Sequence, residues 1–552
     1  MSITSITIQN FKGIKDKTTV HFKPITLLFG PNSAGKSTII QALHYIKQVF
    51  VNRNLDADVS FAYDGEIRSG GFEHIITSHD FSKEMILGIC INKYHNIKES
   101  EKKYGFNPLI INELIEHEKE IYVELYIIWD SLKMKPIVKS YSLFIGGMKV
   151  LSIEYILHSN LTKLVYFNID HFIFEKEMLY RYPEFIYEFK LDEKEKYTYK
   201  TAFEKIFNDY FNNKNHIYDY DFLQHAVDCA LPKSDFNSVS LKISDEEYEI
   251  DDDAMPMLVK ADPRMPFFEG IIFKKLLKSY GLVKNELIDN LRIGPLRSLP
   301  LRLEENQVPR QDRFITGKAA WNILFGSDED FIKKFNYWIN ERLETGYKAK
   351  IIHYKEVESR FSDSEIDDDL KDVYKKAPIK KKLIFISKNN NEVMLQDVGF
   401  GFSQILPVIV ATLMSKKETS QIYFRDRKYG DFDKGIISIE QPELHIHPKL
   451  QVELGDLFIE QSKKDKVIFL IETHSEHLLL RILRRIRETT NGTLAEGLTP
   501  IQAEDVSVKY VENIEMDGYR RSVVREMPLN KQGELVKAWP GGFFEEGLRE
   551  VF

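Results

Sequence analysis

A single loop of eight residues constrains this chain more than any other feature. Residues 30–37 read Gly-Pro-Asn-Ser-Ala-Gly-Lys-Ser, which matches the G-x-x-x-x-G-K-S/T pattern of a phosphate-binding loop. The apolar run 25–29 precedes the loop and the run 38–46 follows it, so the loop joins a strand to a helix, as the motif requires. The residues expected to bind the nucleotide here are Gly30, Pro31, Asn32, Ser33, Ala34, Gly35, Lys36, Ser37 and Thr38.

Each part of this loop suits one part of a nucleoside triphosphate. The backbone N–H groups of the loop and of the helix N-terminus can cradle the phosphates. Lys36 can reach the outer phosphates, and the Ser37 hydroxyl can bind Mg²⁺. The sequence therefore predicts ATP and Mg²⁺ as the cofactors.

The other half of the site lies late in the chain. The apolar run 436–439 is typical of a buried strand and ends in Glu440, which we expect to act with Ser37 in holding the hydrated Mg²⁺. A second such run, 467–471, ends in Glu472-Thr473-His474-Ser475.

A second glycine-rich helix start lies between these two halves. Residues 396–404 carry glycine and serine and open the apolar helix expected over 405–414. Such a helix start is itself a phosphate-binding end, and one nucleotide rarely needs two of them within one chain. We therefore expect a dimer in which Gly401, Ser403 and Gln404 of each subunit cap the γ-phosphate bound by the other.

Together these motifs resemble the ABC-type ATPase heads of the RecF and SMC kind. The resemblance extends to the opening strand at 6–14 and to the tail at 539–544. Among these heads, the chain resembles more specifically the AAA family ATPases that include OLD-like and Septu-type (PtuA-like) or retron-associated defence proteins. It implies an α/β P-loop head with a mixed sheet, an antiparallel β-subdomain and a helical insertion. Position by position, it makes 399–404 the signature, Glu440 the Walker B acid and His474 the switch histidine near the γ-phosphate.

One residue departs from the pattern of these heads. Where they carry a second carboxylate directly after Walker B, this chain has Gln441. An amide can orient the attacking water, but it cannot accept its proton. Hydrolysis should therefore be slow, or should use another acceptor such as Glu443 or His474. The alternative for Glu443 is that it simply caps or pairs near the next helix.

The pattern of elements divides the chain into four parts. Strands with a Gly146-Gly147 hairpin turn follow the P-loop. The region after these strands lacks the sustained heptads of a coiled-coil arm. A final hairpin is expected over 506–527. The predicted parts are 1–156, the first ATPase lobe with the β-subdomain; 157–285, a helical insertion; 286–490, the helical lobe with signature, Walker B and switch histidine; and 491–552, a hairpin and tail.

Composition restricts the remaining classes. The 552 residues are 43% hydrophobic, and two cysteines are too few for a disulfide framework or a thiolate metal site. No apolar stretch is long enough to span a bilayer, so no membrane partner is expected and the cytoplasm is the expected location. The net charge of −8 neither requires nor excludes nucleic acid. The basic stretches 375–382 and 481–487 are either solvated surface or phosphate-binding patches.

These features lead to three hypotheses of function. The first is an ATP-gated switch, a homodimer or higher even-numbered oligomer of heads that controls a separate HNH-type nuclease in anti-phage defence, because 491–552 is too short for a Toprim nuclease. Nucleic acid or a complex of reverse transcriptase and msDNA is a further candidate partner. The second hypothesis is a RecF-like DNA-repair ATPase that binds duplex DNA, and the third is a housekeeping ATPase.

Overall fold

The computed structural model describes the chain in stretches that form two compact units. The first unit comprises Met1–Asn10, Lys47–Asp56 and His79–Leu287, and the second comprises Phe11–Ile46, Ala57–Ser78 and Ile288–Phe552. The described residues within them are 2–56, 71–92, 120–157, 161–168, 279–298, 314–355, 375–394, 397–414, 435–516 and 518–540.

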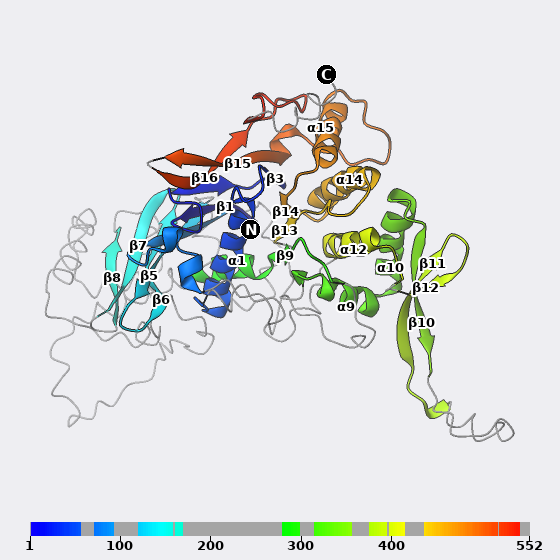
Figure 1. The fold of residues 1–552 in the computed structure, drawn as a ribbon, viewed down its shortest axis with the longest axis horizontal. Helices are drawn as coiled ribbons and strands as arrows, with labels where there is room; N and C mark the ends of the chain where they lie inside the picture. Colours follow the sequence, from blue (N-terminus) through cyan, green and yellow to red (C-terminus); the bar gives the residue numbers. More distant parts are fainter. Residues whose placement is uncertain are drawn as a thin grey trace, which may run out of the picture. The chain divides into compact units, whose positions relative to one another are not determined.

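An antiparallel sheet forms the core of the first unit (Figure 1, blue to cyan). The strands of this sheet that belong to the first unit lie in the order β1-β4-β5-β6-β7-β8, and each one pairs antiparallel with the next. Gly146 and Gly147 both have positive φ and join β6 to β7, so the predicted hairpin is confirmed. The strands are β1 (Ser2–Gln9), β4 (Met85–Asn92), β5 (Glu120–Asp130), β6 (Lys135–Ile145), β7 (Met148–Ile156) and β8 (Leu161–Phe167).

The last of these strands corrects the predicted helical insertion. Strand β8 lies within 157–285, and it continues the sheet by pairing with β7 along its whole length. Its β-branched and aromatic residues favour a pleated strand over a helix, and β7 offers the free edge for it. Residues 279–288 are helical as expected, and the Tyr280 hydroxyl donates to the Phe50 carbonyl at 2.6 Å. Residues 169–278, the rest of the predicted insertion, lie outside the described part.

A largely parallel sheet organises the second unit. Its described strands follow the order β16-β15-β3-β14-β13-β9, and all neighbours are parallel except β16, which forms an antiparallel hairpin with β15. Every residue of β3 and β13 is buried, as in parallel strands covered on both faces. The strands are β3 (Ile25–Phe29), β9 (Leu291–Ile293), β13 (Ile436–Glu440), β14 (Ile468–Glu472), β15 (Val506–Met516) and β16 (Tyr519–Met527).

Helices and a small sheet complete the second unit. Within 286–490, predicted as the helical lobe, the described residues form helices and also the three-stranded antiparallel sheet β10-β11-β12, which the sequence analysis did not predict. Phe385 of β11 packs edge-on against Phe402, and this contact joins the small sheet to α12. The elements are α1 (Lys36–Lys47), α9 (Lys318–Gly326), α10 (Glu329–Asn336), η8 (Tyr337–Arg342), β10 (Tyr347–Tyr354), β11 (Lys380–Ser387), β12 (Glu392–Val393), α12 (Phe400–Leu413), α14 (Pro448–Lys464) and α15 (Glu476–Thr490). The short elements of the two units together are β2 (Thr18–His21), η1 (Gln48–Asn52), η2 (Phe72–His74), η3 (Thr77–His79) and η9 (Ala503–Asp505).

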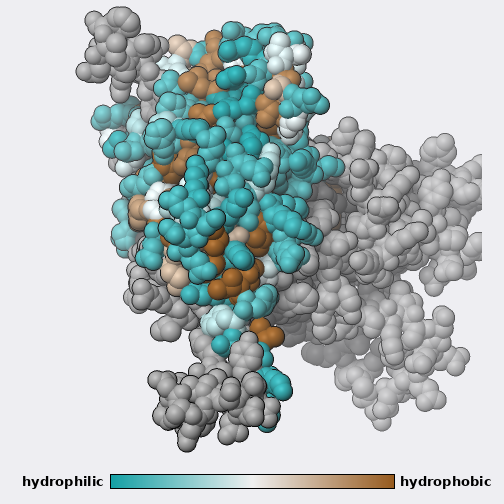
Figure 2. Space-filling model, turned by 90° about the vertical axis from the view of Figure 1, so that its right-hand side faces the viewer, coloured by the Kyte–Doolittle hydropathy of each residue, from teal (hydrophilic) through white to brown (hydrophobic). Residues whose placement is uncertain are grey.

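The side of the molecule on the right of Figure 1 is mostly hydrophilic where it is described. Figure 2 shows hydrophobic residues there as patches divided by hydrophilic ones. None of the helices in the described ranges has both the length and the apolar content needed to cross a membrane.

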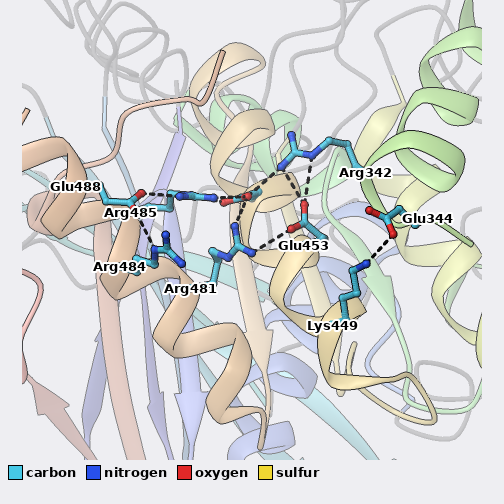
Figure 3. Close-up of polar contacts among 9 residues, drawn as sticks. Arg342, Glu344, Lys449, Glu453, Arg481, Arg484, Arg485 and Glu488 are labelled. Carbon is cyan, nitrogen blue, oxygen red and sulfur yellow. Dashed lines mark hydrogen bonds and ion pairs between the residues drawn. The ribbon is translucent and has the colours of Figure 1, made fainter. Parts of the chain in front are cut away.

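A network of ion pairs joins α14, α15 and the end of η8 in the second unit (Figure 3). The buried Asp456 of α14 accepts hydrogen bonds from Arg485 at 2.8 and 2.9 Å, from Arg481 at 2.8 Å and from Arg342 at 2.9 Å. Glu453, one helical turn earlier, accepts from Arg342 and Arg481 at 3.0 Å each. One carboxylate pair thus holds three elements together.

This network revises the interpretation of two arginines in the basic stretch 481–487, whereas Arg484 and Arg487 are exposed, as solvated surface would be. Arg481 and Arg485 are neither part of a phosphate-binding surface nor part of a solvated stripe, because both are engaged with Asp456. Arg484 is exposed and pairs with Glu488 along the helix. The sequence could not show this, because the acids lie on a different helix.

We expect Asp456→Asn to destabilise the second unit strongly. Removing one partner of a buried ion pair costs about 3–5 kcal/mol, because the remaining charges stay buried without compensation. The matched control is Glu344→Gln, which breaks a pair with Lys449 whose side chains are 58% and 59% exposed. An exposed pair is worth about 1 kcal/mol at most.

Urea denaturation followed by tryptophan fluorescence measures both variants, since Trp338 lies 4.9 Å from the Arg342 guanidinium and reports on this region. A similar small shift of the midpoint in both variants would contradict the assigned role of Asp456.

Candidate nucleotide-binding site

The predicted P-loop lies between β3 and α1, at the carboxyl edge of the parallel sheet. Gly30 and Gly35 have φ values of 140° and 105°, a backbone region that side chains rarely adopt. Pro31, Asn32 and Ser33 are exposed at the turn. Their exposure leaves the loop open to a ligand, while α1 begins directly behind it.

The β15–β16 hairpin supports this loop from one side. A Cβ on Gly30 would lie 1.9 Å from the Val511 carbonyl oxygen, so only glycine allows the loop to approach β15 this closely. The Asn513 amide donates to the Ser33 carbonyl at 3.0 Å, and Ser522 donates to Asn513 at 3.1 Å. The hairpin, predicted merely as a terminal element, is therefore part of the site.

Lys36 is held inside the loop that it belongs to. Its ammonium group donates to the carbonyl oxygens of Gly30 at 3.0 Å and Pro31 at 2.9 Å. Burial lowers the pKa of Lys36, and the charges of Glu472 and Glu443 oppose this effect. A phosphate can take the place of these carbonyls as the partner of the ammonium group.

The two acids at the strand ends have different partners. Glu440 is bound by Arg292 of β9, whose Nε and Nη2 atoms both lie 2.8 Å from one carboxylate oxygen. Glu472, which pairs with Glu440 in the strand register, instead accepts a hydrogen bond from the Ser37 hydroxyl at 2.6 Å. Burial, and secondarily the charge of Glu440, raises the pKa of Glu472 to about 7.

Gln441 follows β13 in an unusual backbone conformation. Its φ of 46° lies in the left-handed region that side chains seldom occupy, and its N–H donates to the Glu472 carbonyl at 2.8 Å. Arg297 also donates to the Gln441 carbonyl at 3.2 Å. These bonds hold the backbone that carries the side chain next to the Walker B position.

Glu443 and His474 lie together on neighbouring turns. Glu443 accepts hydrogen bonds from the Thr473 hydroxyl at 2.8 Å and from the His474 N–H at 2.7 Å, so it pairs with the segment after β14. Burial raises the pKa of Glu443. Burial and the Lys36 charge lower the pKa of His474 to about 4, which keeps its imidazole neutral at pH 7.

The signature segment does not expose the side chains that were predicted to cap a partner's γ-phosphate. Ser403 and Gln404 are 1% and 2% exposed, and the Ser403 hydroxyl donates to the Phe400 carbonyl at 2.6 Å. Their side chains face the interior of their own subunit, because α12 buries that side against the core. A Cβ on Gly401 would lie 2.4 Å from the His445 carbonyl, and Phe400, 56% exposed, has its ring beside that of His445.

Arg297 connects the signature helix to the Walker B strand. A guanidinium group can bind phosphates or acids, but the hydrogen bonds of this one go to backbone carbonyls. Its guanidinium donates to the carbonyls of Gln404 at 3.1 Å and Glu440 at 2.7 Å, while the Gln404 amide donates to the Arg297 carbonyl at 2.8 Å.

Sequence reasoning assigned no role to several residues that meet here. Arg292 could have been noticed as a charged residue within a short buried strand, and Glu472 ends its strand as Glu440 does. Lys12 follows the opening strand and donates to Gln41 at 2.6 Å. Burial, followed by the charge of Arg292, lowers the pKa of Lys12 to about 8.

The arrangement is that of a P-loop ATPase head of the ABC type. It combines a strand, P-loop and helix with two strands that end in acids and a separate helix that begins at a glycine. Residues 1–479 match the family model of the AAA ATPase domain. The chain belongs to this family, and it is an ATPase.

Other proteins show more distant similarity. Over 111 residues, 19% of this chain, it is 30% identical to the chromosome partition protein Smc of Halobacteriovorax marinus, of which the match spans 9%. An Smc head solved with the C-winged helix domain of ScpA has a TM-score of 0.37 at 11% identity, over 96% of this chain and 98% of that one. The SMC head domain from Thermotoga maritima has a TM-score of 0.34 at 9% identity, over 95% and 100% of the two chains.

We expect Lys36→Ala to abolish ATP binding. The variant removes the one ammonium group of the loop, and with it the charge that offsets the outer phosphates. Equilibrium binding of a fluorescent ATP analogue measures the loss, and Lys23→Ala serves as the control, since Lys23 bonds carbonyls near β15 instead. Near-normal affinity in Lys36→Ala would rule out this loop as the nucleotide site.

Proposed function

We propose that this ATPase is a nucleotide-gated switch that binds Mg²⁺ and ATP, closes as a head dimer and thereby controls a separate effector nuclease in anti-phage defence. The observation that carries the proposal is Gln441, an amide where a proton-accepting carboxylate would speed hydrolysis. A head that keeps ATP for long periods suits a switch better than a motor. The effector and the defence role follow from the sequence resemblance.

The chemistry of the site supports slow turnover. Bound Mg²⁺ would neutralise charge on the phosphates, with Ser37 and a strand-end carboxylate to hold it. Gln441 can orient a water through its amide, as a glutamine does in GTPases. Glu443 already accepts two hydrogen bonds, so its carboxylate is committed to positioning the switch segment.

We expect Gln441→Glu to speed hydrolysis. A carboxylate here can accept the proton of the attacking water, and general-base catalysis is worth about 10²- to 10⁴-fold. Single-turnover assays compare it with the wild type and with Gln441→Ala, which supplies no base. If the wild type already turns over quickly and Gln441→Glu is no faster, another residue accepts the proton and the slow-switch proposal is wrong.

The proposed dimer would use the exposed start of α12. Gly399 and Phe400 are exposed while Ser403 and Gln404 are buried, so the partner's nucleotide would meet the backbone of the signature and the Phe400 ring. A bulky substitution at Ser403 would place a new side chain in the core, so a loss of dimer closure could not be distinguished from a loss of folding. Phe400 offers the cleaner position.

We expect the effector to bind only the ATP-held dimer. With a candidate HNH-type nuclease as bait, the wild type and Gln441→Ala should each form the complex with ATP and lose it without nucleotide. Phe400→Glu should bind ATP normally yet fail to dimerise or to retain the nuclease, because it places a charge in the proposed interface. Tyr337→Glu, an exposed aromatic on η8, is the matched control. Nuclease retention without nucleotide would contradict the gating proposal.

A RecF-like DNA-binding ATPase is the second candidate, and exposed lysines favour it. Lys348 and Lys350 of β10 and Lys381 of β11 are exposed on two paired strands. Lys375 and Lys376, also exposed, shortly precede β11. Such a group would bind duplex phosphates with a steep dependence on salt. Loss of salt-dependent DNA binding on reversing the charges of the three lysines on these strands, with no nuclease partner found, would favour this candidate over the switch.

A further inference from the structure

The carboxylate closest to the P-loop serine is not the predicted Walker B acid. Ser37 donates to Glu472 at 2.6 Å, and Glu472 is the last residue of β14, the strand that lies directly beside β3. Glu440 lies one strand further away, on β13. Strand order therefore places Glu472 next to the hydroxyl that is expected to bind Mg²⁺.

The two acids also differ in how their charge is compensated. Glu440 forms a buried ion pair with Arg292, and both side chains are 6% exposed. Within the described ranges, no basic side chain forms an ion pair with Glu472, and its carboxylate accepts its hydrogen bond from a neutral hydroxyl. The Lys36 ammonium favours the charged form of Glu472 only from beyond ion-pair distance. The buried carboxylate is therefore only partly compensated, and a bound cation would lower the remaining cost.

The donor set fits magnesium bound together with a nucleotide. Mg²⁺ prefers oxygen ligands and typically takes one or two carboxylates from the protein, with phosphates and waters completing its octahedron. Ser37 and Glu472 supply a hydroxyl and a carboxylate side by side. The described residues contain no group of three or more His, Cys, Asp or Glu side chains that could hold a metal alone.

We propose that Glu472, and not Glu440, is the carboxylate that holds the nucleotide's Mg²⁺ beside Ser37. Glu440 is then a positioning residue, which fixes Arg292 and the end of β13. The inference rests on the proposed binding of Mg²⁺ with ATP, and it revises the expectation that Glu440 is the metal ligand.

The test measures how strongly a metal improves nucleotide binding, without using turnover. The full-length wild type, Glu472→Gln and Glu440→Gln are titrated with a non-hydrolysable ATP analogue, once with Mn²⁺ and once with EDTA. The two variants make the same carboxylate-to-amide change on adjacent strands, so each is the control for the other. The ratio of the two dissociation constants is the metal enhancement.

We expect Glu472→Gln to reduce this enhancement at least ~10-fold, since losing a ligand or its support weakens metal binding by about 10- to 100-fold. Glu440→Gln should keep the enhancement within about twofold of the wild type. An equal or larger loss in Glu440→Gln, or no loss in Glu472→Gln, would overturn the proposal. Absence of nucleotide binding by the wild type in EDTA and in Mn²⁺ alike would instead refute the ATP site itself, and the metal assignment with it.

Glu472→Asp provides a second test of the proposal in case the amide variant does not fold. It keeps the negative charge, but its side chain is one methylene shorter and holds the carboxylate further from Ser37. The metal enhancement should therefore fall by a measurable factor that is smaller than in Glu472→Gln. Thermal melting of each variant establishes that it is folded. If Glu472→Gln does not fold, an unchanged enhancement in Glu472→Asp overturns the proposal.

Discussion

The site depends on the parallel register of β3, β14 and β13. This register sets Leu28 beside Glu472, and Glu472 beside Glu440, so all three strands end at one edge of the sheet. Carboxyl ends of parallel strands are where ligands bind in open α/β sheets. The hydrogen bond between Ser37 and Glu472 spans 435 positions in sequence, and only this register brings the two together.

Much of the local structure could be predicted because its causes are local. The P-loop, the Gly146-Gly147 hairpin and the strands that end in Glu440 and Glu472 follow from residue pattern and turn chemistry. The small β10–β12 sheet was missed because it sits within a stretch assigned to helices. Strand β8 was missed because it was counted with the predicted insertion at 157–285, although its own residues favour a strand and β7 supplies its partner.

The choice of partners within the site could not be predicted. Whether Glu440 faces a metal or an arginine depends on β9, which joins the sheet from 148 positions away. The inward turn of Ser403 and Gln404 depends likewise on Arg297, which lies 107 positions before Gln404 in the sequence. The partner of a buried side chain depends on which residues the tertiary structure places next to it, and the local sequence pattern does not show those residues.

Two buried interactions tie the signature lobe to the strand ends. Arg297 binds the Glu440 and Gln404 carbonyls at once, so a shift at the end of β13 is transmitted to the start of α12. Asp456 joins the end of η8 to α14 and α15, the helices that follow the Walker B and switch segments. Because charged hydrogen bonds of this kind are costly to break one at a time, the lobe should move as one piece with the strand ends. The nucleotide proposed to bind at the sheet edge would in this way shift the exposed Phe400 without any direct contact between them.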